Sequence, residues 1–224
     1  MTTVLITGAN RGLGLEFARQ YRADGAEVIA CCRRPDKCDS LQALNVTLME
    51  LDVADAASIA RLAVALNGKP IDILINNAGT WGGEQQRADD CPPEAMIETF
   101  KVNTVGPLLV SRALKTNLLA GRDKKLAVVT SKMGSISDSS GGVVAYRAAK
   151  AALNIVMHGV AKEWARDGIV IGILHPGWVR TDMGGPGAPL DVVQSVTGMR
   201  ARIADLSPQT SGCFLDYQGR EIGW

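Results

Sequence analysis

The feature of this sequence that most constrains its fold is a series of seven short apolar runs separated by longer, helix-compatible segments. The runs are apolar almost throughout, as expected of strands buried on both faces, and lie at 3–7, 27–32, 46–51, 71–76, 125–130, 169–174 and 213–217. The helix-compatible segments lie at about 12–24, 55–66, 93–119, 143–167 and 189–204. Strands that alternate with helices form right-handed crossovers and a mainly parallel sheet. The sequence therefore predicts a single α/β domain over residues 1–224, doubly wound, with helices on both faces of a seven-stranded sheet.

The composition narrows the classes of partner and cofactor. The formal net charge of the 224 residues is +1, which gives no electrostatic basis for binding nucleic acid or an anionic membrane. No stretch approaches the roughly 18 apolar residues of a membrane span, and the N-terminus lacks the pattern of a secretion signal. The five cysteines match no zinc-binding spacing, and the two histidines, His158 and His175, are far apart. We therefore expect free thiols, no metal site and a cytoplasmic location.

A glycine-rich turn follows the first predicted strand. In TGANRGLG, residues 7–14, glycines at 8, 12 and 14 lead from the strand into a helix. Such glycines let the backbone approach a pyrophosphate, whose charge then faces the helix N-terminus. A tight connection without a ligand would favour the same residues, so this turn alone leaves both interpretations open.

Tyr146 and Lys150 lie four positions apart in AYRAAK, residues 145–150, within a segment of strong helix formers. Positions i and i+4 share one face of a helix, so the phenol and the ammonium are expected side by side. A nearby ammonium favours the phenolate and is expected to lower the pKa of Tyr146 from about 10. The pair is suited to proton transfer, although Tyr and Lys at this spacing also occur on helix surfaces without a chemical role.

Several separated motifs together resemble the short-chain dehydrogenase/reductase family. The glycine spacing is T-G-x-x-x-G-x-G, and it is followed in order by NNAG at 76–79, KVNTVGP at 101–107, a serine at 131, YRAAK at 146–150 and HPGWVRT at 175–181. The segments TSKMGSI at 130–136, GGVVAYRAAKAALN at 141–154 and DYQGREIGW at 216–224 are similar to the C-factor-like branch, which groups with small NADPH-dependent carbonyl reductases. The resemblance implies a Rossmann-type fold for the predicted domain.

The resemblance also implies a catalytic set. Tyr146 would donate a proton, Ser131 would polarise the substrate carbonyl, and Lys150 would hydrogen-bond the nicotinamide ribose. Asn103 would hold a water relay to Lys150 at a local break in its helix, or else be a polar residue in a turn. Ser135 is a rival to Ser131, because Ser131 lies fifteen residues before Tyr146, slightly more than is usual in the family. The expected substrate contacts are Trp81, Met133, Ser135 and Trp178, together with a loop near 184–199. Both histidines are expected to be structural.

The choice of dinucleotide rests on the end of the second predicted strand. Cys32 stands where an acidic residue would bind the ribose 2′-hydroxyl of NAD, and Arg33 follows it, so NADP (NADPH) is expected. Asp52 and Val53 resemble the pair that flanks the adenine, with a helix N-cap as the alternative role of Asp52. The other cofactor-binding residues that the resemblance implies are Gly8, Asn10, Arg11, Gly12, Leu13, Gly14, Asn76, Ala78, Gly79, Tyr146, Lys150, Pro176, Gly177, Val179 and Thr181.

The function expected from the resemblance is NADPH-dependent reduction of an aldehyde or ketone by a homodimer or homotetramer. The alternative is a C-factor-like signalling protein that binds NAD(P) with little turnover. An epimerase or dehydratase on the same scaffold would need a longer C-terminal substrate region than the 74 residues that follow Lys150.

Overall fold

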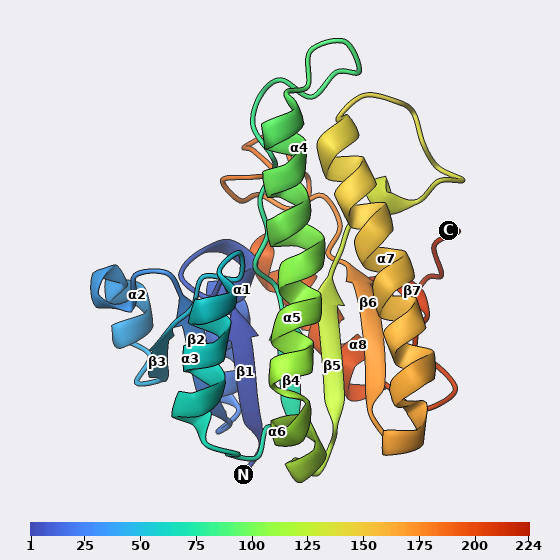
Figure 1. Cartoon of the computed structure of the whole chain (residues 1–224). Coiled ribbons are helices and arrows are strands. Elements are labelled where there is room, and N and C mark those ends of the chain that lie inside the picture. Colours follow the sequence, from blue (N-terminus) through green and yellow to red (C-terminus); the bar gives the residue numbers. More distant parts are fainter.

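The computed structural model describes residues 1–224 and contains one seven-stranded sheet (Figure 1). Every neighbouring pair of strands is parallel, and the order across the sheet is β3-β2-β1-β4-β5-β6-β7. The strands are β1 (Thr3–Thr7), β2 (Glu27–Cys32), β3 (Thr47–Glu50), β4 (Ile73–Asn76), β5 (Lys125–Val129), β6 (Val170–His175) and β7 (Phe214–Asp216). The predicted fold class is therefore confirmed, with a sheet that is parallel throughout.

The direction in which the sheet is built reverses between β1 and β4. From β1 the chain first adds β2 and β3 on one side, and then crosses to β4 on the other side. In open parallel sheets, ligands bind in the crevice outside the carboxyl ends of the strands at such a switch point. Any functional residue at the ends of β1, β4 and β5 is thus brought to one edge of the molecule.

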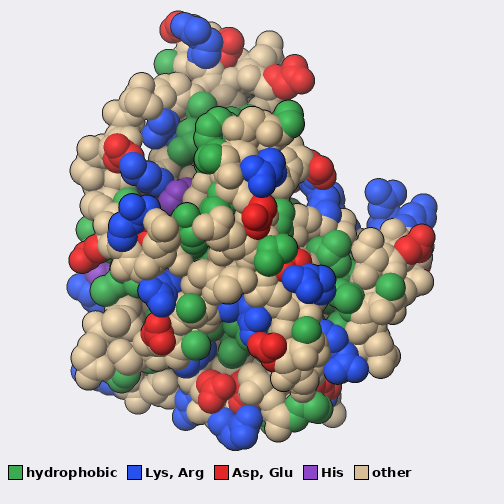
Figure 2. All heavy atoms as spheres, turned by 180° about the vertical axis from the view of Figure 1, so that it is seen from behind, with side chains coloured by type: hydrophobic (Ala, Val, Ile, Leu, Met, Phe, Trp, Pro, Cys, Tyr) green, Lys and Arg blue, Asp and Glu red, His purple; other side chains and the backbone are tan.

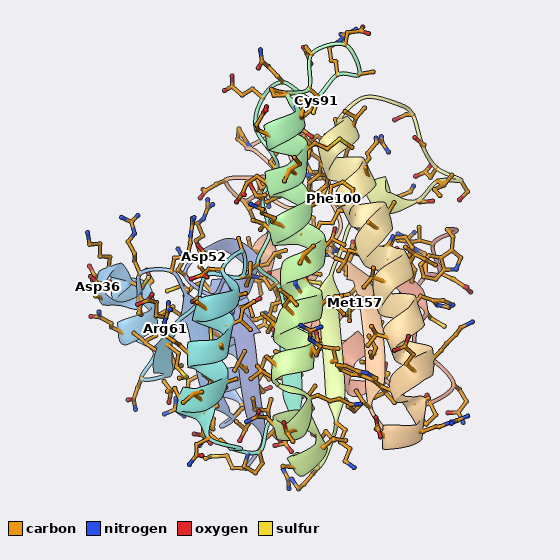
Figure 3. All side chains as sticks on the ribbon, viewed as in Figure 1. Asp36, Asp52, Arg61, Cys91, Phe100 and Met157 are labelled. Atoms are coloured by element: carbon orange, nitrogen blue, oxygen red, sulfur yellow. The ribbon has the colours of Figure 1, made fainter.

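Helices cover both faces of the sheet, and each face has its own core (Figure 1). The helices α3, α5 and α7 pack on one face through residues such as Leu62, Val110 and Met157, and Figure 3 labels Met157 on α7. The helices α1 and α8 pack on the other face through Phe17 and Met199. The helices are α1 (Gly12–Ala23), α2 (Asp39–Gln42), α3 (Ala56–Leu66), α4 (Pro93–Phe100), α5 (Gly106–Ala113), α6 (Lys115–Ala120), α7 (Val144–Trp164) and α8 (Val192–Ala204).

The long helix predicted over 93–119 is divided by a π-helical turn. Residues Lys101–Val105 form this turn between α4 and α5, and α6 follows α5 after Leu114. Pro107 lies in the first turn of α5 and has no N–H to donate to the π-helical turn that precedes it. The last helix, α8, begins at Val192, whereas the sequence predicted a start at about 189. Its N-cap is Asp191, whose carboxylate accepts the Gln194 amide. Residues 192–199 of the expected substrate loop are therefore helical.

The outer surface has no dominant charge. Figure 2 shows basic, acidic and hydrophobic side chains mixed over the back of the molecule, in keeping with a net charge of +1. None of the helices is both long and apolar enough to cross a membrane.

Candidate active site

The glycine turn after β1 fits tightly against the end of β4. A Cβ added to Gly14 would lie 2.2 Å from the Gly8 carbonyl oxygen and 2.6 Å from Asn77 Nδ2, so no side chain fits there. Gly8 has φ of +64° and would place a Cβ 2.8 Å from the Ala78 Cα. The turn is therefore pressed onto the NNAG segment at the switch point, with its backbone free of side chains and the N-terminus of α1 behind it.

Asn77 is a site residue that the sequence reasoning missed. Its Nδ2 donates to the carbonyl oxygens of Thr7 and Gly8 at 3.0 and 3.1 Å, and the Thr7 hydroxyl accepts the amides of Asn77 and Ala78 at 3.0 Å. Asn76 faces the other way, since its Nδ2 donates to Ser111 Oγ of α5 at 2.8 Å. Asn77 thus fixes the glycine turn, while the Asn76 side chain points away from that turn and braces α5.

Tyr146 and Lys150 lie on the buried face of α7, as the i, i+4 spacing predicted. Lys150 Nζ lies 5.8 Å from the centre of the Tyr146 ring and donates to the Val129 carbonyl oxygen at 2.9 Å. Burial raises the pKa of Tyr146 to about 12 and lowers the pKa of Lys150 to about 8. The expectation that Lys150 lowers the pKa of Tyr146 is thus wrong for this arrangement, because desolvation dominates and Lys150 turns its ammonium to β5. The Ser131 hydroxyl is the group whose hydrogen bonding opposes the rise at Tyr146.

Asn103 occupies the centre of the π-helical turn and is fully buried. Its Oδ1 accepts the Thr80 amide and its Nδ2 donates to the Thr80 carbonyl oxygen, both at 2.8 Å. A Cβ placed on Gly79 would meet Asn103 Oδ1 at 3.2 Å and Lys150 Nζ at 3.8 Å. Asn103 therefore lies at the expected break in its helix and shares one small space with Gly79 and Lys150.

The structure separates the two candidate serines. Ser131 follows β5, its Oγ accepts the Met133 amide at 3.1 Å, and it adjoins the Tyr146 hydroxyl. Ser135 is buried, and its Oγ donates to the Gly223 carbonyl oxygen at 2.6 Å and contacts Ser137 Oγ at 3.0 Å. Ser135 thus ties the segment after β5 to the end of the chain, while Ser131 is the serine that faces Tyr146.

Gln86 is a second residue that the sequence reasoning missed. This buried side chain accepts the backbone amide of Tyr146 at 3.1 Å through Oε1 and donates to the Trp81 carbonyl oxygen at 2.7 Å through Nε2. The backbone carbonyl oxygen of Gln86 accepts the Val144 amide at 2.9 Å. The Trp81 ring lies 4.8 Å from the Tyr146 ring, centre to centre. The segment after β4 thus caps α7 and places an aromatic wall beside the phenol.

The residues expected near the adenine and its ribose gather at the ends of β2 and β3. Arg33 is exposed directly after β2, and Cys32 is nearly buried. Asp52 follows β3, where Figure 3 labels it, and its Oδ1 accepts the Ala54 amide at 2.9 Å. The N-cap of α3 is Asp55, so the N-cap alternative for Asp52 is wrong. Val53 is buried, and its carbonyl oxygen would be 2.7 Å from a Cβ on Gly106.

The turn after β6 closes the opposite side of the crevice. A Cβ on Gly12 would lie 3.4 Å from Thr181 Cγ2, and the Arg11 guanidinium forms an ion pair with the Asp182 carboxylate. Gly177 has φ of +86°, and a side chain there would collide with Leu190. The other expected residues of this turn are Pro176, whose carbonyl accepts the Ser195 hydroxyl, and Val179, which bridges to Leu190.

The expected substrate contacts Trp178 and Met133 differ in how exposed they are. Trp178 is 61% exposed, and its Nε1 donates to the Gly184 carbonyl oxygen at 2.8 Å. Met133 is half-buried beside Ser131, and Asn10 and Leu13 line the glycine turn. His175 ends β6, and burial lowers its pKa to about 4, so it is neutral at pH 7.

Comparison with known proteins relates the whole chain to one family. The model of the short chain dehydrogenase family matches residues 2–188. The C-signal of Myxococcus xanthus is 45% identical over 161 residues, which cover 69% of this chain and 93% of that relative. The 1-hydroxy-2-glutathionyl-2-methyl-3-butene dehydrogenase of Rhodococcus sp. (strain AD45) is 34% identical, with 100% of both chains covered.

Two solved structures show how similar the arrangement is. The NADPH-bound carbonyl reductase from chicken fatty liver is 34% identical with a TM-score of 0.91, covering 100% of this chain and 99% of that chain. A carbonyl reductase from Pseudomonas aeruginosa PAO1 in complex with NADP is 33% identical with a TM-score of 0.86, covering 100% of both chains.

Proposed function

The chain belongs to the short-chain dehydrogenase family, and we propose that it is an NADPH-dependent carbonyl reductase that converts an aldehyde or ketone to the alcohol. The observation that carries the proposal is the meeting of Ser131, Tyr146, Lys150 and Asn103 at the carboxyl edge of the sheet, beside the glycine turn. The relatives support an oxidoreductase, and the four side chains support proton transfer to a carbonyl oxygen.

The residues at the crevice fit a dinucleotide. Gly8 and Gly14 let the glycine turn pack closely against Ala78 and Asn77, where a Cβ would collide, and the turn leads into the N-terminus of α1, where a pyrophosphate is favoured. Exposed Arg33, with no acid at position 32, suits the 2′-phosphate of NADP. The two solved relatives with NADPH or NADP bound add support for this choice. The site would be formed by the glycine turn, Cys32, Arg33, Asp52, Val53, Ala78, Gly79 and the turn after β6.

Bound NADPH would supply the hydride, and the side chains of this chain would handle the proton. Ser131 is placed to donate a hydrogen bond to the substrate carbonyl oxygen, and Tyr146 to donate the proton that the oxygen needs as it becomes a hydroxyl. Lys150 is placed to hold a ribose hydroxyl through Nζ if it releases the Val129 carbonyl. Asn103 would hold a water relay to Lys150 near the small space beside Gly79.

The walls beside Tyr146 favour an apolar substrate. The Trp81 ring packs against the phenol at an interplanar angle of 39°, and Met133 lies near Ser131. Exposed Trp178 extends from the turn after β6. We infer a mostly hydrophobic carbonyl compound, with its oxygen near Ser131 and Tyr146 and its bulk against the aromatic side chains.

The outward faces of α4, α5 and α7 suit a second copy of the chain. In Figure 1, α4 and α5 follow one another along one line and α7 runs beside them. The exposed apolar residues are Ile97 on α4, Val105 at the π-helical turn and Ile155 on α7. Apolar residues exposed on neighbouring helices are typical of a subunit interface. A homodimer formed through these helices is part of the proposal.

A signalling role is the second candidate, and the 45% identity to C-signal favours it. The two functions differ in whether the protein must convert a carbonyl substrate to product. Purified protein would be assayed for NADPH consumption with a panel of aldehydes and ketones, beside NADPH titration by fluorescence. Turnover that disappears in Tyr146→Phe supports the reductase. Tight NADPH binding with no turnover on any carbonyl favours the signalling role.

A further inference from the structure

Two thiols meet where β2 ends. Cys32 is the last residue of β2, Cys38 immediately precedes α2, and their Sγ atoms lie 3.5 Å apart. The Cys38 thiol also donates to the Arg34 carbonyl oxygen at 3.1 Å. A disulfide needs a sulfur separation of about 2.05 Å, so the two atoms need to approach by only about 1.5 Å. The short segment 33–37 joins them and carries Arg33, the residue proposed for the 2′-phosphate.

The two thiols differ in access, which sets the order in which they can react. Cys38 is partly exposed, while Cys32 is 4% exposed and packs in the core under α1. Neighbouring Cys31 is fully buried in the core on the opposite face of the sheet and cannot compete. Cys38 is thus the attacking thiol and Cys32 the resolving one.

We propose that Cys32 and Cys38 form a redox-active pair, which a low-molecular-weight disulfide oxidises to an intramolecular disulfide that weakens NADPH binding. The Cys38 thiolate attacks one sulfur of the small disulfide, forms a mixed disulfide and releases one thiol. Cys32 then loses its proton to solvent and attacks the Cys38 sulfur, which releases the second thiol. Two cysteine thiols are oxidised, and one small disulfide is reduced to two thiols.

The bond changes the shape of the segment that holds the proposed phosphate ligand. Oxidation removes the thiol proton that Cys38 donates to the Arg34 carbonyl oxygen, and it draws the two ends of segment 33–37 together. The Arg33 backbone is then held in a different conformation, and the guanidinium loses its alignment with a 2′-phosphate. This effect on affinity rests on the proposed NADPH-dependent function, whereas formation of the disulfide does not.

The test treats the full chain with oxidised glutathione, blocks remaining thiols with N-ethylmaleimide and maps the peptides by mass spectrometry. The expected product links Cys32 to Cys38 and reverts with dithiothreitol. The affinity for NADPH should fall about tenfold, as for the loss of one charge-assisted contact, while the affinity for NADH changes little. The matched controls are Cys38→Ser, which should form no linked peptide and keep its NADPH affinity, and Cys213→Ser, which should behave as the wild type.

Each outcome bears on one part of the inference. Wild-type protein that retains glutathione on Cys38, or keeps both thiols free, overturns the redox pair even where NADPH binds the reduced protein. A linked peptide without change in NADPH affinity overturns the regulatory effect. A linked peptide in a protein that does not bind NADPH when reduced overturns the proposed cofactor and leaves the redox pair standing.

Discussion

The side chain of Gln86 accepts a hydrogen bond from the backbone amide of Tyr146 at 3.1 Å, across 60 residues of sequence. The first amides of a helix have no partner within it, and α7 lacks a side-chain cap of its own, since Val143 stands at the N-cap position. Gln86 supplies that partner, and through its Nε2 it also holds Trp81 and Gly83. The start of the Tyr146 helix is thereby connected to Trp81, which we propose as a wall of the substrate pocket.

Gln86→Ala should lower kcat about tenfold and leave NADPH affinity within about twofold of the wild type. The change frees the start of α7 and Trp81, while the glycine turn keeps its contacts. A lost cap should also lower the free energy of unfolding by about 1 kcal/mol. Steady-state kinetics beside NADPH titration would measure this, with exposed Gln85→Ala as control. Lower stability with unchanged kcat would show that Gln86 has no positioning role.

Tyr146→Phe should reduce kcat by about 10²–10⁴-fold with almost unchanged NADPH binding. The ring and its contact with Trp81 remain, and only the proton donor is lost. The control is Tyr21→Phe, which removes a buried hydroxyl from α1, away from the carboxyl edge, and should keep its kcat. Wild-type kcat in Tyr146→Phe would contradict the assignment and favour the signalling role.

Lys150→Met should stabilise the protein at pH 7 while it abolishes turnover. Burial lowers the pKa of Lys150 from 10.5 to about 8, so the unfolded chain binds more protons between these values. The folded wild type therefore pays a free-energy cost for burying the charged amine, on the order of 3 kcal/mol. This cost is complete below pH 8 and fades as pH rises toward 10.5. The advantage of the variant should therefore shrink from pH 8 toward 10.

Denaturant unfolding of wild type and Lys150→Met from pH 7 to 9.5 would test this window. Higher pH is avoided because the pKa of buried Tyr146, about 12, makes the folded state lose stability above pH 10. Exposed Lys162→Met, on the same helix, should show no such pH-dependent gain. A variant less stable than the wild type at pH 7 would show that the Val129 contact outweighs desolvation.

Ser131→Ala and Ser135→Ala should affect different properties. Ser131→Ala removes the hydroxyl beside Tyr146 and should cut kcat, and it should lower the melting temperature less than Ser135→Ala does, because Ser131 Oγ accepts only the Met133 amide. Ser135→Ala leaves the Gly223 carbonyl oxygen without its donor and should lower the melting temperature, with a smaller effect that falls mainly on KM. Kinetics and thermal unfolding of both variants distinguish them, and the reverse pattern would exchange their roles.

Arg33→Ala should narrow the preference for NADPH over NADH. One charge-assisted contact to a phosphate contributes about 1.5–3 kcal/mol, which corresponds to roughly tenfold or more in affinity. NADH affinity should barely change, because NADH has no 2′-phosphate. Arg61→Ala, on α3, is the control. Equal affinity of the wild type for both cofactors would refute the NADP assignment.

The sequence was most informative where a residue's role follows from its immediate neighbours. Except for β3, at the edge of the sheet, the strands are largely buried, so their apolar runs are continuous, and the bounds of all seven strands differ from the prediction by at most two residues. The Tyr146–Lys150 face followed from helical spacing alone. Asp52 and Asp55 are equally good N-cap residues in the sequence, and only the actual start of α3 decides between them.

What the sequence did not show depends on contacts between distant segments. Gln86 acts through Tyr146, and Asn77 acts through Thr7 and Gly8, with about 60 to 70 residues between partners. The expected effect of Lys150 on Tyr146 was wrong because it assumed solvent-like surroundings. The depth of burial that reverses it arises only when α7 packs on β5.

The π-helical turn at Lys101–Val105 also bears on how this chain can change over evolutionary time. A π turn is equivalent to one inserted residue, and its removal would rotate all of α5 by about 100° relative to α4. Asn103 would then leave Thr80, or Ser111 would leave Asn76, because one regular helix cannot serve both contacts. The effects of substitutions on α4 and α5 therefore depend on one another. A replacement tolerated in a relative with an uninterrupted helix would fail here unless the residue that it contacts were replaced as well.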